Sequence, residues 1–201
     1  MIIKRIRYRQ RDFCLDDIDE LKRINWSLAK YGCGPTAIAN ALVNLGFNVT
    51  PIDTAKKILY DKNGNFDNTY LRNRGINSDG IIYCLERLIN ENKFDISYEI
   101  VKIDFLKPND EKEKIISLIK DENLAIIHVG PSDESPLTFS ENGHYLVVSD
   151  VDENNNFYVI NSNIIGDKQI GVPFEYDTII KNMIGRKDSF NFLFVKKSHS
   201  L

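Results

Sequence analysis

The sequence predicts an α+β protein in which a helical lobe packs on an antiparallel β-sheet. Apolar residues recur at helical spacing up to about residue 122, and the segments after it are mostly short and rich in β-branched and aromatic residues. Helices followed by strands in this order are typical of α+β domains. Because 201 residues suffice to bury a core, we expect a single domain over residues 1–201, with a helical part at about 1–122 and a sheet part at about 123–201.

The helices are expected from apolar periodicity and from signals at their ends. The most distinctive one begins near Cys33 and stops at Gly46, and its apolar face holds Ile38, Ala41, Leu42 and Leu45. Another follows Thr50, with a proline at the first helical position and Asp53 at the third, and should end near Asn63. Further helices are expected at residues 16–24, at 79–91 with Ser78 as cap, and at 110–122 with a cap near Asn109.

Strands are expected at residues 96–103, 124–129, 144–151, 157–160 and 190–195. The turn at residues 152–156 should join the third and fourth of them as a hairpin. A short helix is expected at residues 174–184, before the last strand.

Three polar segments allow more than one interpretation. Residues 2–11 carry five basic side chains and favour a solvated edge strand that leads into an active-site cleft. The acidic residues that follow at once argue against a nucleic-acid-binding arm. Residues 65–78 favour an ordinary surface loop, with a loop bordering the cleft as the alternative. Residues 131–142 are a candidate for one wall of the cleft.

The composition excludes several functional classes. A net charge of −3 gives no general attraction to nucleic acid or to anionic membranes. No run of 18 apolar residues is present, so no membrane span is expected. The first residues lack the apolar region of a signal peptide. We therefore expect a cytoplasmic location for the chain as given, and secretion if a leader was trimmed.

Three cysteines, an odd number, argue against a disulfide framework and for a reducing compartment. Neither Cys-x-x-Cys nor His-x-x-x-His occurs, so we expect no metal, and no other cofactor is implied. Cys14 is expected to be a surface or half-buried thiol and Cys84 a core thiol. His128, inside an apolar segment, is expected to pack or bond locally.

The third cysteine, Cys33, lies where unpaired N–H groups and the positive end of a helix dipole favour a thiolate. His144 opens one predicted strand and Asn161 closes its hairpin partner, so the two side chains can meet. Taken singly, the cysteine could be a small residue at a tight turn and the histidine a structural one. Their order along the chain favours a Cys-His-Asn site for nucleophilic catalysis.

At these residues the chain resembles a known family. Gly-Cys-Gly-Pro-Thr around Cys33, Gly-His-Tyr around His144 and the strand that ends on Asn161 are similar to papain-like cysteine peptidases related to the bacteriocin-processing, double-glycine-leader peptidases. Residues 8–12 resemble the family's Tyr-x-Gln-x-Asp segment, which implies that Gln10 serves the oxyanion hole. Two departures are visible. Asn161 is followed by Ser162 where relatives more often have Asp-Pro, and the processing peptidases place the glutamine where this chain has Ser27.

The resemblance implies a papain-like fold and a cysteine peptidase. Cys33 would attack a peptide or amide carbonyl to form a thioester, His144 would protonate the leaving amine, and Asn161 would orient the imidazole. The oxyanion donor would be Gln10, with Ser27 or Asn25 as alternatives. The partner would be a peptide or protein substrate. Two alternatives remain open: an acyl transferase or cell-wall peptide hydrolase using the same site, and a catalytically silent peptide-binding relative.

Overall fold

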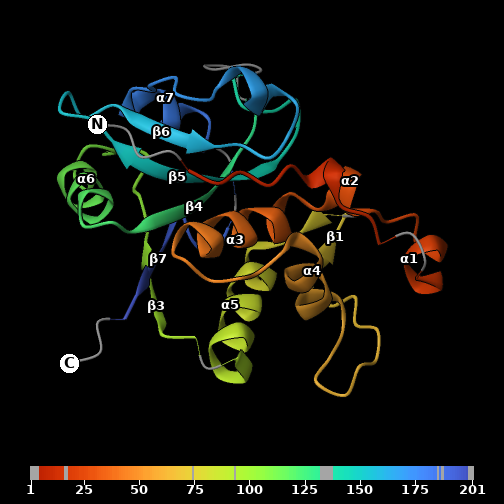
Figure 1. Cartoon of the computed structure of the whole chain (residues 1–201). Coiled ribbons are helices and arrows are strands. Elements are labelled where there is room, and N and C mark those ends of the chain that lie inside the picture. The colour runs from red at the N-terminus through yellow and green to blue at the C-terminus, as the bar shows by residue number, and fades with distance from the viewer. Residues whose placement is uncertain are drawn as a thin grey trace.

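The computed structural model describes residues 5–15, 18–73, 75–92, 94–131, 138–184, 186 and 188–198. A five-stranded antiparallel sheet is the centre of the fold (Figure 1), and its strands lie in the order β3 (Ile96–Val101), β7 (Phe192–Lys197), β4 (Leu124–Val129), β5 (His144–Val151), β6 (Phe157–Ile160). All five predicted strands are confirmed, and the bounds of β4, β5 and β6 match the prediction. The edge strand β3 comes from the part of the chain before residue 123.

Helices cover both faces of this sheet (Figure 1). One face packs on α3 (Cys33–Asn44), α4 (Pro51–Leu59) and α5 (Ser78–Asn92), and the other on α6 (Lys112–Lys120) and α7 (Tyr176–Lys181). Successive residues of a strand point to opposite faces, so Tyr145 and Val147 of β5 join the first core, and Leu146 and Val148 join the second. Because β5 is buried on both faces, its sequence is a nearly continuous apolar run.

The helix ends follow local hydrogen bonding. Thr50 caps α4 as predicted: its Oγ1 accepts from the N–H of Asp53 at 3.3 Å, and its own N–H donates to Asp53 Oδ2 at 2.9 Å. The helix nevertheless ends at Leu59, before the expected Asn63, because the Asp61 carboxylate accepts the N–H groups of Asn63 and Asn65 at 2.8 Å each and closes a turn there. The expected Asn109 cap of α6 is wrong, since that helix follows Glu111 with no side-chain cap.

The remaining elements are short. They are η1 (Gln10–Asp12), α1 (Asp19–Arg23), α2 (Leu28–Tyr31), the hairpin β1 (Leu71–Arg72) and β2 (Gly75–Ile76), and η2 (Ile165–Lys168). Across the described ranges, no helix has the length and apolar character needed to cross a membrane.

In its described part, residues 5–11, the N-terminal segment does not form the edge strand expected from its alternating charges. Its backbone is paired instead by two asparagine side chains of α3. Asn44 bonds both the N–H and the C=O of Ile6 (2.8 and 2.7 Å), and Asn40 does the same for Tyr8 (2.6 and 3.2 Å). Side-chain amides thus form the backbone hydrogen bonds that a neighbouring strand would otherwise form, and they attach this segment to α3.

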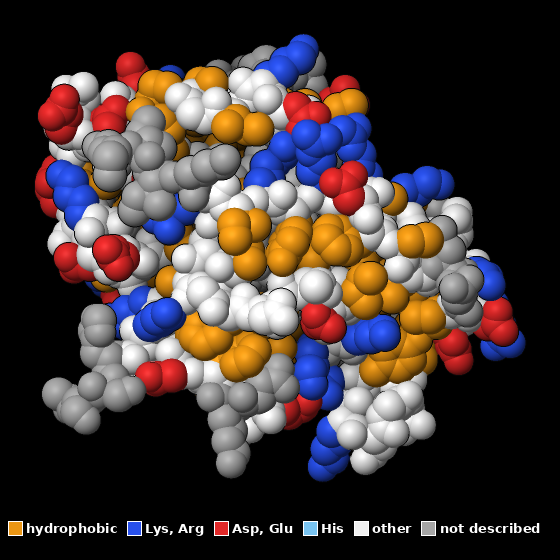
Figure 2. Space-filling view, in the orientation of Figure 1, with side chains coloured by type: hydrophobic (Ala, Val, Ile, Leu, Met, Phe, Trp, Pro, Cys, Tyr) orange, Lys and Arg blue, Asp and Glu red, His pale blue; other side chains and the backbone are white. Residues whose placement is uncertain are grey.

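The basic side chains of residues 5–11 are paired rather than merely solvated. Arg5 contacts Asp150 at 2.9 Å, while Arg7, Arg9 and Arg11 all converge on Asp167, at 2.6, 3.3 and 3.3 Å. Figure 2 shows Lys and Arg side chains gathered beside acidic ones near the place where this segment reaches α2. Together these arginines hold the start of the chain against η2 and the end of β5.

Candidate active site

Cys33 is the first residue of α3 and lies half-buried beside the start of β5. Little space is left beside Gly34, the next residue, since a Cβ there would lie 2.8 Å from Ile81 Cδ1. Burial raises the pKa of the Cys33 thiol, and the backbone N–H groups of Tyr145, Gly34 and Cys33 itself lower it in part. The helix-terminus effect expected from the sequence is therefore present, but burial is the larger influence and favours the neutral thiol.

His144 and Asn161 form a buried pair, with 4% and 1% of their surfaces exposed. The distance from His144 Nε2 to Asn161 Oδ1 is 2.8 Å. The amide orientation of Asn161 is set by its other partners, because Nδ2 donates to the Phe139 carbonyl at 3.1 Å and to Gln169 Oε1 at 2.8 Å. Oδ1 must then accept from His144, so Nε2 carries the proton and Nδ1 is the ring nitrogen able to accept one.

Gln169 is a site residue that the sequence analysis missed. It is 94% buried, accepts from Asn161, and donates its own Nε2 to the Thr138 carbonyl at 2.7 Å. It therefore fixes Asn161, which fixes His144. No local pattern marks it, because it follows a polar turn like many surface glutamines, and only its long-range partners distinguish it.

Arg7 is a second missed residue, since its charge had suggested a solvated side chain. Its Nε donates to the Asn161 carbonyl at 2.5 Å, its Nη2 donates to the Asn163 carbonyl at 2.7 Å, and its Nη1 pairs with Asp167. One guanidinium thus holds the backbone that carries Asn161.

Cys33 and His144 come from elements that pack together, α3 and β5, but no hydrogen bond joins the thiol to the imidazole in the described structure. Burial lowers the pKa of His144 to about 4, and this outweighs the hydrogen bond with Asn161, which raises it. Both groups are consequently neutral at rest near pH 7. That Cys33 and His144 act together in one catalytic site stays a prediction.

Gln10 lies at the start of η1, between the two parts of the site. Its Nε2 donates to the Ala29 carbonyl at 2.8 Å, and its Oε1 accepts from Ser162 Oγ at 3.4 Å. Ala29 belongs to α2, just before Cys33, and Ser162 follows Asn161. Ser27 precedes α2 and provides no side-chain cap for it, while Asn25 is exposed.

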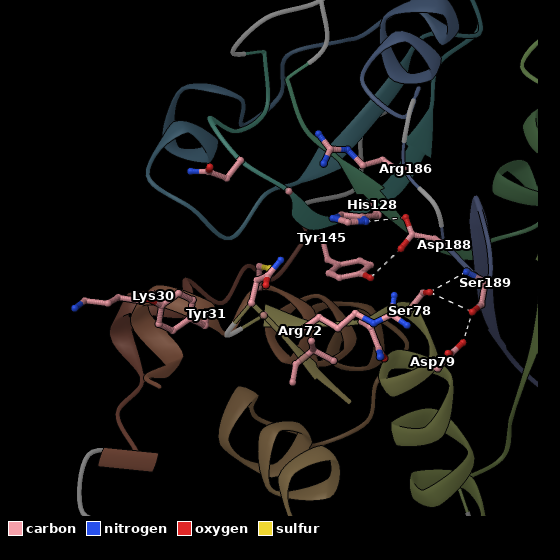
Figure 3. Close-up of a pocket in the computed structure, with 17 residues that line it drawn as sticks. Lys30, Tyr31, Arg72, Ser78, Asp79, His128, Tyr145, Arg186, Asp188 and Ser189 are labelled. Carbon is pink, nitrogen blue, oxygen red and sulfur yellow. Dashed lines mark hydrogen bonds and ion pairs between the residues drawn. The ribbon is translucent and has the colours of Figure 1, made fainter. Parts of the chain in front are cut away.

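A cavity of about 980 Å³ opens beside Cys33 (Figure 3). Its walls come from α2, the β1–β2 hairpin, the start of α5, the ends of β4 and β5 that face it, and the residues Arg186, Asp188 and Ser189. The segment 65–78, for which an ordinary surface loop was favoured, therefore borders the cleft through Arg72 and its neighbours. Of the segment 131–142, Asn142 lines the cavity, and residues 132–137 lie outside the described residues.

The environments of Cys14, Cys84 and His128 agree with the sequence-based expectations. Cys14 is exposed and Cys84 is buried, where burial raises the pKa of its thiol far above the ordinary value. His128 bonds locally: its Nδ1 lies 2.7 Å from Asp188 Oδ2, and its ring stacks on Tyr145 with centroids 4.4 Å apart.

A cysteine helix packed on an antiparallel sheet that carries histidine and asparagine is the arrangement of papain-like cysteine peptidases, and this is the class of the protein. The chain belongs to the Peptidase_C39 like family, whose model matches residues 7–177.

Two solved structures illustrate the likeness. A protein described as a C39-like peptidase from Bacillus anthracis is 15% identical, with a TM-score of 0.53 over 84% of this chain and 90% of that one. The peptidase domain of Streptococcus ComA, a bifunctional ABC transporter involved in quorum sensing, is also 15% identical, with a TM-score of 0.47 over 82% and 88%. A search of curated proteins found no match.

Proposed function

We propose that this peptidase hydrolyses a peptide or amide bond through Cys33, His144 and Asn161, with a thioester intermediate. The observation that supports this most directly is the buried His144–Asn161 pair, whose hydrogen bonds leave Nδ1 as the proton acceptor beside the strand that Cys33 contacts. The three residues come from separate parts of the chain, and this tautomer leaves Nδ1 unprotonated, as a general base requires.

In the proposed mechanism the resting thiol and imidazole are neutral. When a substrate carbonyl reaches Cys33, Nδ1 of His144 takes the thiol proton and the sulfur forms a bond to the carbonyl carbon. The imidazolium then gives that proton to the leaving amine as the C–N bond breaks. Water attacks the thioester with His144 again accepting a proton, and cleavage of the C–S bond returns the proton to sulfur and releases the acid.

The negative charge on the carbonyl oxygen needs donors during both steps. The backbone N–H of Cys33, at the N-terminus of α3, is one donor. The Gln10 amide is the proposed second donor, because it has two N–H groups and the Ala29 carbonyl accepts only one of them. Its position between α2 and Ser162 supports this choice over Asn25, whose side chain is exposed.

The test is to incubate the protein with a peptide library and to identify cleaved products by mass spectrometry. Cys33→Ser and His144→Ala should abolish cleavage, while Cys14→Ser should cleave like the wild type. Rapid quenching should trap an acyl group on Cys33. If peptides bind but are never cleaved, the protein is a catalytically inactive peptide-binding member of the family. If added amines are acylated in preference to water, it is an acyl transferase.

A further inference from the structure

Arg186 occupies an unusual place in the wall of the cavity. Its guanidinium lies between two glycines, at the end of β4 and just before β5. A Cβ on Gly130 would lie 1.8 Å from Nη2, and one on Gly143 would lie 3.5 Å from Nη1. A side chain at Gly130 would therefore displace this guanidinium, which sits next to the residue that precedes His144.

The donors of Arg186 are incompletely used. Nη2 donates to the Pro131 carbonyl at a long 3.3 Å, and Nε is buried with no acceptor among the described residues. A buried, unpartnered donor on a charged group is costly and calls for an explanation. Nη1 is not fully buried and also has no acceptor among the described residues, so it is the donor that an anionic ligand in the cavity would engage.

The charges that line the cavity favour the same kind of ligand. The two carboxylates have partners within the wall: Asp188 bonds His128 and Tyr145, and Asp79 accepts from the Ser189 hydroxyl. By contrast, the three cationic side chains of the wall lack an acidic partner among the described residues. Over the described part of the chain, no ion pair involves Lys30, Arg72 or Arg186, although all three line the cavity. Figure 3 shows Arg186 and Arg72 on opposite sides of Tyr145.

We propose that this part of the cavity binds a carboxylate of the substrate, with Arg186 as the specificity-determining residue and Arg72 supporting it from the β1–β2 hairpin. A guanidinium offers a planar fork of donors that matches a carboxylate. The carboxylate is that of an acidic side chain near the scissile bond or of a free C-terminus. The inference rests on the proposed function in one respect, that the substrate lies in the cavity beside Cys33.

A pair of thiol reagents tests the inference without any need for peptide cleavage. Iodoacetate carries a carboxylate, and iodoacetamide is its neutral counterpart. The intact protein is alkylated at about pH 8.5, where thiols react readily. The rate with iodoacetate is divided by the rate with iodoacetamide, both at Cys33 and, as an internal reference, at the exposed Cys14. We expect the ratio at Cys33 to exceed that at Cys14 by about tenfold, the order expected for one charged hydrogen bond.

Variants then assign the effect. Arg186→Gln should lower the ratio at Cys33 by about tenfold and leave that at Cys14 unchanged, whereas Lys62→Gln, an exposed lysine outside the cavity, should change neither. If Arg186→Gln does not fold, as judged by circular dichroism, Arg72→Gln provides the same test because that side chain is exposed. An unchanged ratio in the folded arginine variant would overturn the proposal, whether or not the protein cleaves peptides.

Protection of Cys33 from iodoacetamide identifies the source of the carboxylate. Acetylated, amidated peptides that contain either Glu or Gln form one arm, and neutral peptides with either a free or an amidated C-terminus form the other. Stronger protection by the Glu peptide indicates an acidic side chain, and stronger protection by the free terminus indicates a terminal carboxylate. Protection that is equal within both pairs overturns the proposal.

Discussion

Asn161 presents its Oδ1 to His144 Nε2 at 2.8 Å because both hydrogens of its Nδ2 are already donated elsewhere, to the Phe139 carbonyl and to Gln169. The tautomer of His144 is thus determined by the groups that bond Asn161, which do not themselves contact the imidazole through these hydrogen bonds. This chain of hydrogen bonds makes Gln169 a positioning residue for the proposed reaction.

Replacing Gln169 by Leu should lower kcat about tenfold, with little change in KM, because Asn161 would lose one of the two acceptors that fix its amide. Asn161→Ala should cost more, about 10²-fold, since the imidazole would lose its orientation altogether. Steady-state kinetics on one cleaved peptide checks both. Asn156→Ala, in the turn at the other end of the hairpin, is the control. A Gln169→Leu variant that is less stable but equally fast would show that the residue is only structural.

Stability should fall in mild acid because of His144. Its pKa is lowered in the folded state, from 6.5 to about 4, so the unfolded chain binds the proton more readily between those pH values. The contribution of this group is complete above about pH 6.5 and is lost as the pH falls through about 4. Between pH 7 and 5 the loss should be about 2 kcal/mol. Urea denaturation checks this, and His144→Gln should show a flatter profile over the same range.

Alkylation of Cys33 by iodoacetamide should follow a titration above the ~8.5 of an ordinary thiol, because burial raises the pKa of this group. His144→Ala should leave that titration nearly unchanged, since no hydrogen bond joins the two side chains in the described structure. Mass spectrometry of the peptide that contains Cys33 gives the alkylation rate at each pH, and the inflection of the rate against pH is compared between the wild type and His144→Ala. A wild-type inflection well below 8.5 that disappears in His144→Ala would instead demonstrate a thiolate–imidazolium pair.

Gln10→Ala should lose about 10²–10³ in kcat while Cys33 is alkylated at the wild-type rate, because an oxyanion donor acts only once the carbonyl carries charge. Ser27→Ala should do little. Single-turnover assays on one peptide, together with alkylation rates, separate the two effects. Should Ser27→Ala alone show the slow turnover, the donor lies at that serine or at Asn25, and the N-terminal segment was matched to the family wrongly.

Local signals predicted much of the fold. The apolar run and the polar turn that bound β5 and β6 are encoded in neighbouring residues, which is why their limits and the meeting of His144 with Asn161 were foreseen. The end of α4 was missed because the Asp61 turn competes with the helix. Cys33, His144, Asn161 and Gln10 could be proposed from motifs.

The contacts that support these residues could not be predicted in the same way. Arg7 reaches Asn161 across 154 positions, and Gln169 contacts the carbonyl of Thr138 across 31. Such partners are determined by tertiary packing, and a basic or polar residue at a turn looks the same with or without them. Burial also reversed one expectation, since it outweighs the helix-terminus effect on the Cys33 thiol.

The contact between Arg7 and Asn161 has a consequence for synthesis of the protein. Arg7 and Cys33 are made before their partners in the site, because the carbonyl that Arg7 holds is added 154 residues after it, and Gln169 later still. A nascent chain therefore carries the thiol of Cys33 before it carries His144, the base that the proposed reaction needs. Activity should begin only after the residues up to Gln169 have been made and packed, which protects the growing chain and its neighbours on the polysome from cleavage.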